Sequence, residues 1–408
     1  MRKNKIDIIS LGCSKNLVDS EHLIRQFQAN GYSVEHNPSR VDGEIVVVNT
    51  CGFIRDAQEE SIDMILELGR AKKEGKIKKL FVMGCLAERF MAQLIDELPE
   101  VDKFYGKFNW KEMLNDLGKS YKEDLSSERY LTTPKHYAYL KISEGCNRFC
   151  AFCAIPLITG RHKSVPMDTL LNEVKHLVSQ GVKEFNVIAQ DLSSYGLDLY
   201  GKMMLPELID QMAQIEGVEW IRLHYAYPTQ FPYDILPVMA KHDNVCKYLD
   251  IALQHSSDKV LNNMQRHITK AETIELIKRI RKEVPGIHIR TTLMVGFTGE
   301  GEEEGTFAAK PFDDIIPEDV KADRLDKIME IQEEISNEIQ SKKVGNVYKV
   351  IIDSVDEMYY SGRTEWDSPE VDPEVLIPVE NSKLEIGNFY QVEITDATPF
   401  ELFGKVVG

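Results

Sequence analysis

The sequence predicts an α/β protein with an open parallel α/β sheet at its N-terminus, a partial (β/α) barrel in its centre and a small β-barrel at its C-terminus. Short apolar runs alternate with segments of helical periodicity through two successive stretches of the chain. The pattern then changes to alternating apolar and polar residues punctuated by Gly and Pro. At 408 residues the chain also exceeds the length at which a single hydrophobic core stops growing, so we expect two or three domains.

The first series of apolar runs defines an N-terminal domain, which we place at residues 1–118. Its strand candidates are residues 6–11, 44–49 and 79–83. Helix-length segments separate them, and this βαβ pattern predicts parallel strands. Residues 119–135 are polar, charged and weakly periodic, so we predict a linker there.

The second series predicts a partial or complete barrel within residues 136–343. Its strand candidates are residues 137–142, 185–189, 220–224, 248–252 and 287–295. Each is followed by a helix-length segment, and five such β/α units in a row are typical of a barrel wall.

A long amphipathic helix is predicted after Pro317, with apolar side chains on one face at Leu325, Ile328, Ile331, Ile335 and Ile339. We expect this face to pack on the barrel, because a coiled coil needs more heptads. Residues 344–408 form the last domain, a small β-barrel of the oligonucleotide-binding kind, with strand candidates 348–352, 375–379, 389–394 and 402–407.

Composition excludes several classes of protein. The chain is 43% hydrophobic and 28% charged, as in globular proteins, and it lacks the run of about eighteen apolar residues that a membrane span needs. No cleavable leader is evident, so we expect a cytoplasmic protein. The formal charge of −17 argues against broad, unspecific binding of phosphates.

Three cysteines lie within eight residues directly after the first strand of the barrel series: Cys146, Cys150 and Cys153. Active sites of β/α barrels lie at this end of the strands. Three thiolates at this spacing can hold three irons of a 4Fe-4S cluster and leave the fourth iron open. A zinc site or an incidental group of cysteines is the alternative, but no fourth zinc ligand is near in the sequence.

The spacing Cys-x-x-x-Cys-x-aromatic-Cys, with Phe152 as the aromatic, resembles the signature of the radical S-adenosylmethionine superfamily. The resemblance implies that the open iron binds S-adenosylmethionine and that Cys146, Cys150 and Cys153 serve its reductive cleavage. Polar residues at later strand ends are candidates to bind this cofactor: Gln190, Asp191, Gln254 and Arg290. Each is equally consistent with a hydrogen-bonded core residue.

Three more cysteines each follow a predicted N-terminal strand: Cys13, Cys51 and Cys85. The carboxyl ends of parallel strands share one crevice, so these thiols can converge on a second cluster with an open iron. Their contexts, Leu-Gly-Cys-Ser-Lys-Asn, Asn-Thr-Cys-Gly-Phe and Met-Gly-Cys-Leu-Ala, resemble the methylthiotransferase family. The seventh cysteine, Cys246, is predicted to be a small core residue.

The resemblance to the methylthiotransferase family covers nearly the whole chain, because the last domain also resembles a TRAM domain. It implies two 4Fe-4S clusters, S-adenosylmethionine as cofactor and an electron donor as partner. The stretches 11–21 and 144–148 resemble the branch that adds a methylthio group to the β-carbon of an aspartate in ribosomal protein twelve of the small subunit. Another branch of the family modifies an adenosine of tRNA.

Charge favours the protein substrate. Residues 344–408 contain four Lys or Arg and thirteen Asp or Glu, which would repel tRNA and attract a basic ribosomal protein. An acidic surface that merely confers solubility is the alternative. A cluster-containing module for RNA binding or electron transfer is a further alternative, but open coordination at both sites argues against it.

The chain departs from the family pattern near residue 300. Residues 296–300, Gly-Phe-Thr-Gly-Glu, run almost directly into the Glu-Glu-Glu-Gly-Thr of residues 302–306. Family members have a helix and a sixth barrel strand between these segments. About one β/α unit is therefore missing, which implies an open barrel wall or a skipped segment.

Overall fold

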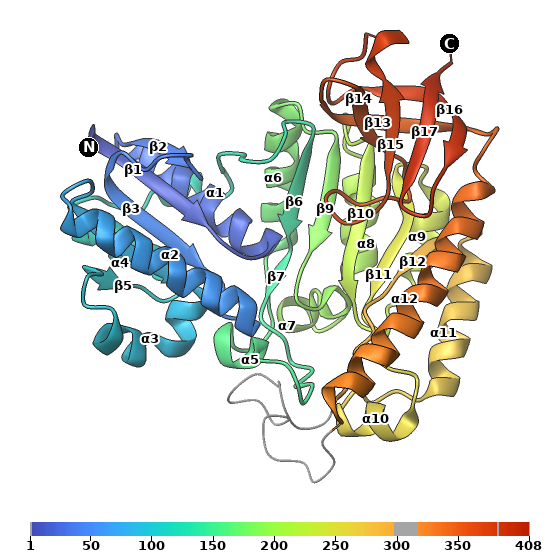
Figure 1. The fold of residues 1–408 in the computed structure, drawn as a ribbon, viewed down its shortest axis with the longest axis horizontal. Helices are drawn as coiled ribbons and strands as arrows, with labels where there is room; N and C mark the ends of the chain where they lie inside the picture. The colour runs from blue at the N-terminus through green and yellow to red at the C-terminus, as the bar shows by residue number, and fades with distance from the viewer. Residues whose placement is uncertain (1, 298–315, 382, 408) are drawn as a thin grey trace.

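A computed structural model of the protein describes residues 2–297, 316–381 and 383–407. Three main sheets follow one another along the chain, and Figure 1 shows the first at the left in blue, the second in the centre and the third at the top in red. The first two sheets are parallel and the third closes into a barrel. The fold class predicted from the sequence is confirmed.

The N-terminal part consists of β1 (Arg2–Ser10), α1 (Ser14–Ala29), β2 (Ser33–His36), β3 (Gly43–Thr50), α2 (Arg55–Lys73), β4 (Lys79–Gly84), α3 (Cys85–Glu97), β5 (Lys103–Phe104) and α4 (Trp110–Asp116). Its strands are parallel in the order β2-β1-β3-β4-β5. Both faces carry Ile and Val because both are covered by helices. Ile6 and Ile8 pack toward α1 and α4, whereas Val46 and Val48 pack toward α2 and α3.

The sequence patterns identified the three inner strands but not β2 and β5, the two edge strands. β2 is only half buried and β5 has two residues, so neither gives a clear apolar run. The order places β1 beside β3, although β2 lies between them in the chain. Such a reversal of strand order opens a crevice at the carboxyl ends of the two strands.

The central part consists of β6 (Tyr137–Lys141), β7 (Ser143–Glu144), α5 (Ile155–Ile158), β8 (Lys163–Ser164), α6 (Met167–Ser179), β9 (Glu184–Ile188), α7 (Leu197–Tyr200), α8 (Leu205–Ala213), β10 (Trp220–Ala226), α9 (Ile235–Lys241), β11 (Val245–Ile251), α10 (Asp258–Asn263), α11 (Lys270–Glu283) and β12 (His288–Arg290). The parallel order β6-β9-β10-β11-β12 follows the chain, as in a barrel wall. The wall stays open within the described residues.

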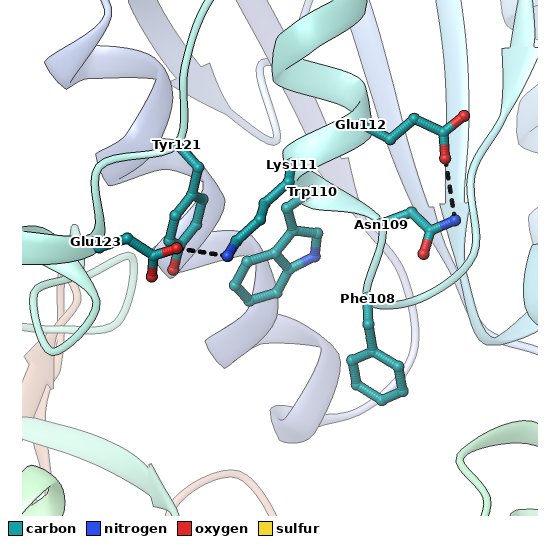
Figure 2. A pocket seen from close by; sticks show the side chains of 7 residues that line it. All are labelled: Phe108, Asn109, Trp110, Lys111, Glu112, Tyr121 and Glu123. Atoms are coloured by element: carbon teal, nitrogen blue, oxygen red, sulfur yellow. Dashed lines mark hydrogen bonds and ion pairs between the residues drawn. The ribbon is translucent and has the colours of Figure 1, made fainter.

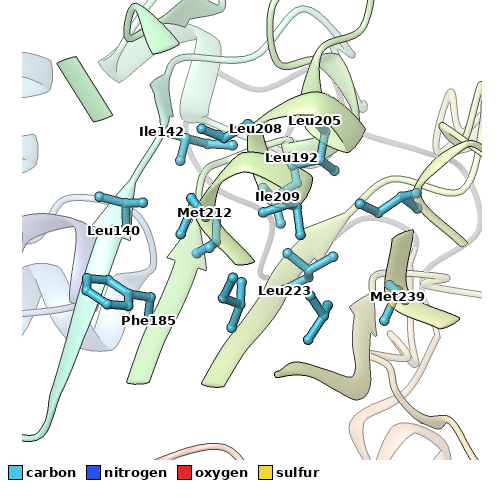
Figure 3. Close-up of a cluster of buried hydrophobic side chains, with 14 of the residues drawn as sticks. Leu140, Ile142, Phe185, Leu192, Leu205, Leu208, Ile209, Met212, Leu223 and Met239 are labelled. Carbon is cyan, nitrogen blue, oxygen red and sulfur yellow. The ribbon is translucent and has the colours of Figure 1, made fainter. Parts of the chain in front are cut away.

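One face of this wall is apolar and the other is polar. Figure 3 shows Leu140, Phe185 and Leu223 of the strands packing against side chains of α8 and α9. The alternate residues on the other face include Glu184, Arg222 and other polar side chains. Because successive side chains of a strand point to opposite faces, this alternation places the apolar core between the sheet and its helices and lines the inner face of the barrel wall with polar side chains.

The last predicted strand of the wall, residues 287–295, is shorter in the structure than expected. β12 ends at Arg290, and beyond it a single bridge joins Gln254 and Leu293. The segment where the sequence departs from the family pattern lies largely outside the described residues. Cys246 is buried among Trp220, Tyr248 and Ile351, which confirms the prediction of a core residue.

The C-terminal part consists of α12 (Glu318–Ser341), β13 (Val347–Val355), β14 (Tyr359–Arg363), β15 (Glu374–Pro378), β16 (Phe389–Ala397) and β17 (Glu401–Val406). The five strands close in the order β13-β14-β15-β17-β16 around a core that includes Val350, Val375 and Val392. The patterns missed β14, which contains the buried Arg363 as well as apolar residues. Short 3₁₀ turns lie at Glu123–Leu125, Leu192–Ser194 and Val379–Asn381.

The prediction that the apolar face of α12 packs on the barrel is wrong for most of that face. Leu325, Ile331, Ile335 and Ile339 are 41–57% exposed. The sheet ends at β12, and no described strand pairs with the far side of β12. Within the described ranges, no further strand therefore lies beside β12 to cover this face.

Residues 119–135 connect the two sheets but are fastened to α1. Arg129 is buried, and its guanidinium forms ion pairs with Glu21 and Glu173 at 3.1 Å each. Arg25 of α1 pairs with Glu128 at 2.9 Å. Arg129 also donates to the carbonyl of Tyr139, so these contacts hold α1 and the linker against β6.

A buried charge network fastens the C-terminal barrel to the central sheet. Arg363 of β14 contacts Glu184 of β9 at 2.7 Å and Asp353 of β13 at 2.6 Å, and Arg222 of β10 contacts Glu184 at 3.2 Å. Burial opposes ionisation of Glu184, but the two guanidinium groups outweigh it and lower the pKa of this carboxyl. Glu184 therefore stays charged and depends on its arginine partners.

We expect Arg363→Met to destabilise the protein by about 3 kcal/mol, because it leaves a buried carboxylate with one of its two cations missing. The matched control is Lys405→Met, which breaks an exposed ion pair with Glu393 at 3.1 Å and should cost less than about 1 kcal/mol. Thermal unfolding of both variants measures the difference. Equal unfolding temperatures would contradict the assignment of Arg363 as a structural anchor.

Candidate cluster-binding site

Cys146, Cys150 and Cys153 lie in a loop that follows β7 at the carboxyl end of the central sheet. The Cys146 amide donates to the carbonyl of Gly160 at 3.2 Å, and the Cys153 amide donates to the carbonyl of Cys150 at 3.1 Å. Gly145 precedes the loop with a φ of +76°, and a Cβ there would lie 2.2 Å from the carbonyl oxygen of Arg161. Only glycine allows the loop to approach the backbone just before β8 so closely.

Polar groups surround the sulfurs of this triad. The Arg148 amide donates to Cys146 Sγ at 3.4 Å, and the Arg266 guanidinium donates to Cys150 Sγ at 3.2 Å. The Tyr227 hydroxyl lies 3.4 Å from Cys150 Sγ. Donors aimed at sulfur stabilise thiolates, the form that binds metal.

Burial raises the pKa of Cys146 to about 12 and that of Cys153 to about 11, and neighbouring thiols add to both shifts. Ionised sulfurs in this loop therefore require a cation. One zinc ion holds its sulfurs about 2.3 Å away, yet among the described residues no three cysteine sulfurs lie within 4.8 Å of one another. A multi-iron cluster fits this donor set better than a single ion.

Cys13, Cys51 and Cys85 lie at the carboxyl ends of β1, β3 and β4, as their places after the predicted strands indicated. Cys13 immediately precedes α1, Cys51 follows β3, and Cys85 begins α3. A Cβ on Gly12, whose φ is +89°, would lie 2.9 Å from Cys51 Sγ. The reversal of strand order between β1 and β3 thus brings the first two cysteine loops into contact.

Asn16 ties the three loops of this triad together and was not identified from the sequence. Its amide nitrogen donates to the carbonyls of Leu11 at 3.2 Å and Thr50 at 3.0 Å. Its amide oxygen accepts from Cys85 Sγ at 3.4 Å. The signals in the sequence were its place in the first turn of the helix after Cys13 and in the Leu-Gly-Cys-Ser-Lys-Asn stretch.

Burial raises the pKa of Cys85 to about 12; the nearby Lys107 opposes this shift, whereas Cys13 and Cys51 add to it. Lys107 is itself buried, 3.0 Å from Glu144 and 3.6 Å from Asp19. Three thiols and a buried cation therefore share one region, which fits a negatively charged cluster. The donor sets of both triads meet the needs of 4Fe-4S clusters.

A network of charged side chains links the two triads. Asp19 of α1 pairs with Lys107 and with Lys141 of β6, and Lys141 contacts Glu144 at 2.7 Å. Glu144 precedes Cys146 by two residues, and Lys107 partly offsets the rise that burial causes in the pKa of Cys85. The network was not predicted, because its members lie far apart in the sequence.

The predicted cofactor residues Gln190 and Asp191 lie at the end of β9 beside the second triad. Asp191 accepts from Arg148 Nε at 2.7 Å and from Ser194 Oγ at 2.5 Å, so it holds the cysteine loop. The amide nitrogen of Gln190 donates to Glu144. Its amide oxygen is buried without a hydrogen-bond partner among the described residues.

The other three predicted residues, Gln254, Arg290 and Phe152, have different surroundings in the structure. Gln254 has a buried amide oxygen that likewise lacks a partner within the described ranges. Arg290 contacts Asp250 at 3.0 Å and lies 3.8 Å from Asp372 of the C-terminal barrel. Phe152 packs edge-on against Phe297, with ring centroids 6.2 Å apart.

A small cavity of about 110 Å³ lies where the three parts of the protein meet. Its lining includes Gly12 and Cys13 from the first cysteine loop, Tyr139 from β6 and Glu370 from the loop between β14 and β15. The Tyr139 hydroxyl donates to Glu370 at 3.4 Å. The C-terminal barrel therefore reaches the loop of the first triad.

Two other features carry no part of the site. A pocket of about 490 Å³ lies beside α4, and no predicted site residue lines it. Figure 2 shows its side chains, among which Lys111 pairs with Glu123 and Asn109 with Glu112. Carboxylates of Asp7, Glu35 and Asp42 cluster elsewhere. The ammonium of Lys5 pairs with all three, so a cation of the protein already lies among them.

Family models match three parts of the chain. Residues 5–106 match "Uncharacterized protein family UPF0004", residues 140–309 match the radical SAM superfamily and residues 344–407 match the TRAM domain. The three matches follow the three sheets of the structure.

Curated relatives match over the full length. A ribosomal protein uS12 methylthiotransferase RimO from Parabacteroides distasonis is 60% identical over 100% of both chains, and one from Porphyromonas gingivalis is 57% identical over 100% of both. The chain belongs to the RimO family of radical S-adenosylmethionine methylthiotransferases. RimO from Flavobacterium johnsoniae is 47% identical over 99% of this chain and 98% of that protein.

RimO membership implies S-adenosylmethionine and 4Fe-4S clusters as cofactors, which the two thiol triads fit. The alignment with the Parabacteroides RimO spans 432 positions, whereas this chain has 408 residues. At least 24 aligned positions therefore lack a residue here, which is enough for one β/α unit.

Solved structures with a similar fold include the radical S-adenosylmethionine methyltransferase TsrM from Kitasatospora setae. It has a TM-score of 0.54 and 13% identity, over 74% of this chain and 71% of that one. The cobalamin-dependent enzyme OxsB has a TM-score of 0.51 and 12% identity, over 72% of this chain and 49% of that one. In the part of the chain that the structure describes, helices long and apolar enough to cross a membrane are absent.

Proposed function

We propose that this RimO-family chain adds a methylthio group to the β-carbon of an aspartate in ribosomal protein uS12 and that it works in the cytoplasm. The observation that carries the proposal is the pair of thiol triads on adjoining parts of one protein. Cys146, Cys150 and Cys153 would hold the cluster for reductive cleavage of S-adenosylmethionine. Cys13, Cys51 and Cys85 would hold the cluster for sulfur transfer.

When bound, these clusters would supply the electron for cofactor cleavage and the centre that carries the sulfur. The protein's own residues hold and screen the thiolates. Asp191 fixes Arg148 and with it the loop of the second triad, and Arg266 donates to Cys150. Gln190 and Gln254 present buried amide oxygens that suit donors of the cofactor.

Closeness of the two triads supports transfer between them. The Asp19, Lys107, Lys141 and Glu144 network spans from the Cys85 region to the start of the Cys146 loop. Buried ion pairs of this kind are rigid, because breaking one leaves an uncompensated charge. Rigid placement matters, since a displacement of about 1 Å can slow a reaction roughly a hundredfold.

The acidic C-terminal barrel supports a basic protein substrate and argues against tRNA. Residues 344–408 contain four basic and thirteen acidic side chains. Glu370 of this barrel lines the same cavity as Cys13, so the barrel borders the site proposed for sulfur transfer. A cationic partner would be attracted there and a polyanion repelled.

Anaerobic reconstitution with iron, sulfide and a chemical electron donor, followed by mass spectrometry, tests the function. Purified uS12, small ribosomal subunits and tRNA are each incubated with the enzyme and S-adenosylmethionine. We expect a methylthio group on an aspartate of uS12 and none on tRNA. Modification of tRNA alone would overturn the substrate assignment, and turnover with a cellular reductant would identify the donor.

We expect charge reversal on the C-terminal barrel to slow association with uS12. Glu357, Glu374 and Glu401 are exposed, and none has an ion-pair partner among the described residues. Their replacement by Lys should slow association about tenfold at low ionic strength and much less at high salt, because exposed charges are screened.

The matched control reverses three exposed acids of the N-terminal helices, Asp63, Glu67 and Asp96, and alters the net charge equally. Association rates are measured by stopped-flow fluorescence against salt concentration. Equal rates for the two triple variants would mean that the acidic barrel serves only solubility.

A further inference from the structure

Lys15 is a buried cation to which the proposed function assigns no role. It lies in the first turn of α1, two residues after Cys13, and only 9% of it is exposed. Among the described residues, its ammonium forms no ion pair with a carboxylate; it lies 3.5 Å from the centroid of the Tyr225 ring. An aromatic face compensates a desolvated ammonium less fully than a carboxylate does.

Nearby carboxylates are occupied by other cations or donors. Asp250 contacts Arg290 at 3.0 Å, and Asp19 pairs with Lys107 and Lys141. Lys15 is close enough to oppose the rise that burial and Asp372 impose on the pKa of Asp250. Its charge therefore acts on the polar interior of the barrel wall without being neutralised there.

Tyr225 is held in a strained conformation at the carboxyl end of β10. Its φ is +66°, in the left-handed region that aromatic residues rarely adopt. The pairing register of β10 with β11 shifts between Leu223 and Ala226, and Tyr225 is exposed although its strand neighbours are buried. Strain of this kind clusters at functional sites, and here it brings the ring to Lys15.

The geometry points to Lys15 as the residue that binds the side-chain carboxylate of the target aspartate. An anionic group entering the interior from the carboxyl ends of the strands would find in Lys15 a desolvated cation without a carboxylate partner, beside the loop of Cys13. Pairing would hold the adjacent β-carbon near the first triad. The inference deepens the proposed function and rests on it.

A double-mutant cycle tests this pairing. The affinity of the reconstituted enzyme for uS12 is measured by isothermal titration calorimetry, with the natural target aspartate and with that aspartate replaced by Asn, for wild-type enzyme and Lys15→Met. A buried charge-assisted hydrogen bond is worth about tenfold or more in affinity. We expect each single change to weaken binding about tenfold and the two together to weaken it no further.

Two further variants sharpen the test. Lys15→Arg keeps the charge and should still prefer aspartate to asparagine, whereas Lys3→Met removes the same charge from an exposed position on β1 and should leave the preference intact. Iron content and circular dichroism establish that each variant is folded and loaded.

Additive effects of Lys15→Met and the Asn substitution would overturn the inference. So would weaker binding of S-adenosylmethionine by Lys15→Met with an unchanged preference for aspartate, because Lys15 would then hold the cofactor. Failure of the proposed function looks different: wild-type enzyme would add no methylthio group to uS12 at all.

Discussion

Replacing Cys146, Cys150 and Cys153 together by Ala is expected to remove about half of the bound iron and to abolish formation of 5′-deoxyadenosine. Each triad lies in its own set of loops, so the loss of one set of thiolates leaves the other donor set intact. The effect on cofactor cleavage should be complete, because all three thiolates proposed to hold this cluster are removed. Iron and sulfide analysis and chromatography of the reaction products measure both outcomes.

Cys246→Ala is the matched control for the triple variant. It removes a buried thiol that packs among Trp220, Tyr248 and Ile351. This thiol belongs to neither triad. Its iron content and cofactor cleavage should equal those of the wild type. If the triple variant lost all its iron while remaining folded, or lost none, two independent clusters would be disproved.

Replacing Cys51 by Ala is expected to abolish methylthio transfer while reductive cleavage of S-adenosylmethionine continues. Cys51 belongs to the N-terminal sheet, and every sulfur contact that we find at the second triad comes from the central part of the chain. Formation of the radical should therefore continue without the cluster that supplies the sulfur. Product analysis under reducing conditions should show 5′-deoxyadenosine and unmodified uS12.

Asn16→Ala provides a graded comparison for the Cys51 variant. It keeps all six thiols but removes the amide that ties Leu11, Thr50 and Cys85 together, so cluster content in the first triad should fall only in part. A well-folded Cys51→Ala protein that no longer cleaves S-adenosylmethionine would contradict the division of labour between the triads.

The charge network between the triads makes a different prediction for its own residues than for the cysteines. Lys107 and Glu144 join the region of Cys85 to the start of the Cys146 loop through a buried ion pair. Substitution of a cysteine leaves this pair in place, whereas loss of either charge would disturb both sites together. Separate effects are therefore expected for cysteine variants and joint effects for variants of the network.

The sequence by itself determined the elements whose signals are local. The Cys146, Cys150 and Cys153 spacing predicted a cluster without reference to any other part of the chain. Apolar runs bounded by helical segments predicted the parallel strands, because burial on both faces demands such runs. Cys13, Cys51 and Cys85 needed one more step, the rule that carboxyl ends of parallel strands meet at one edge.

Only the tertiary structure decided which residues surround these thiols. Asn16, Lys107 and Glu370 come from parts of the chain that no periodicity connects, and their roles arise from contacts between segments far apart in the sequence. The exposed face of α12 is a case in which a local pattern predicted a contact that the structure does not contain. Its apolar pattern predicted packing, but packing requires a partner surface, and the described sheet ends at β12 before supplying one.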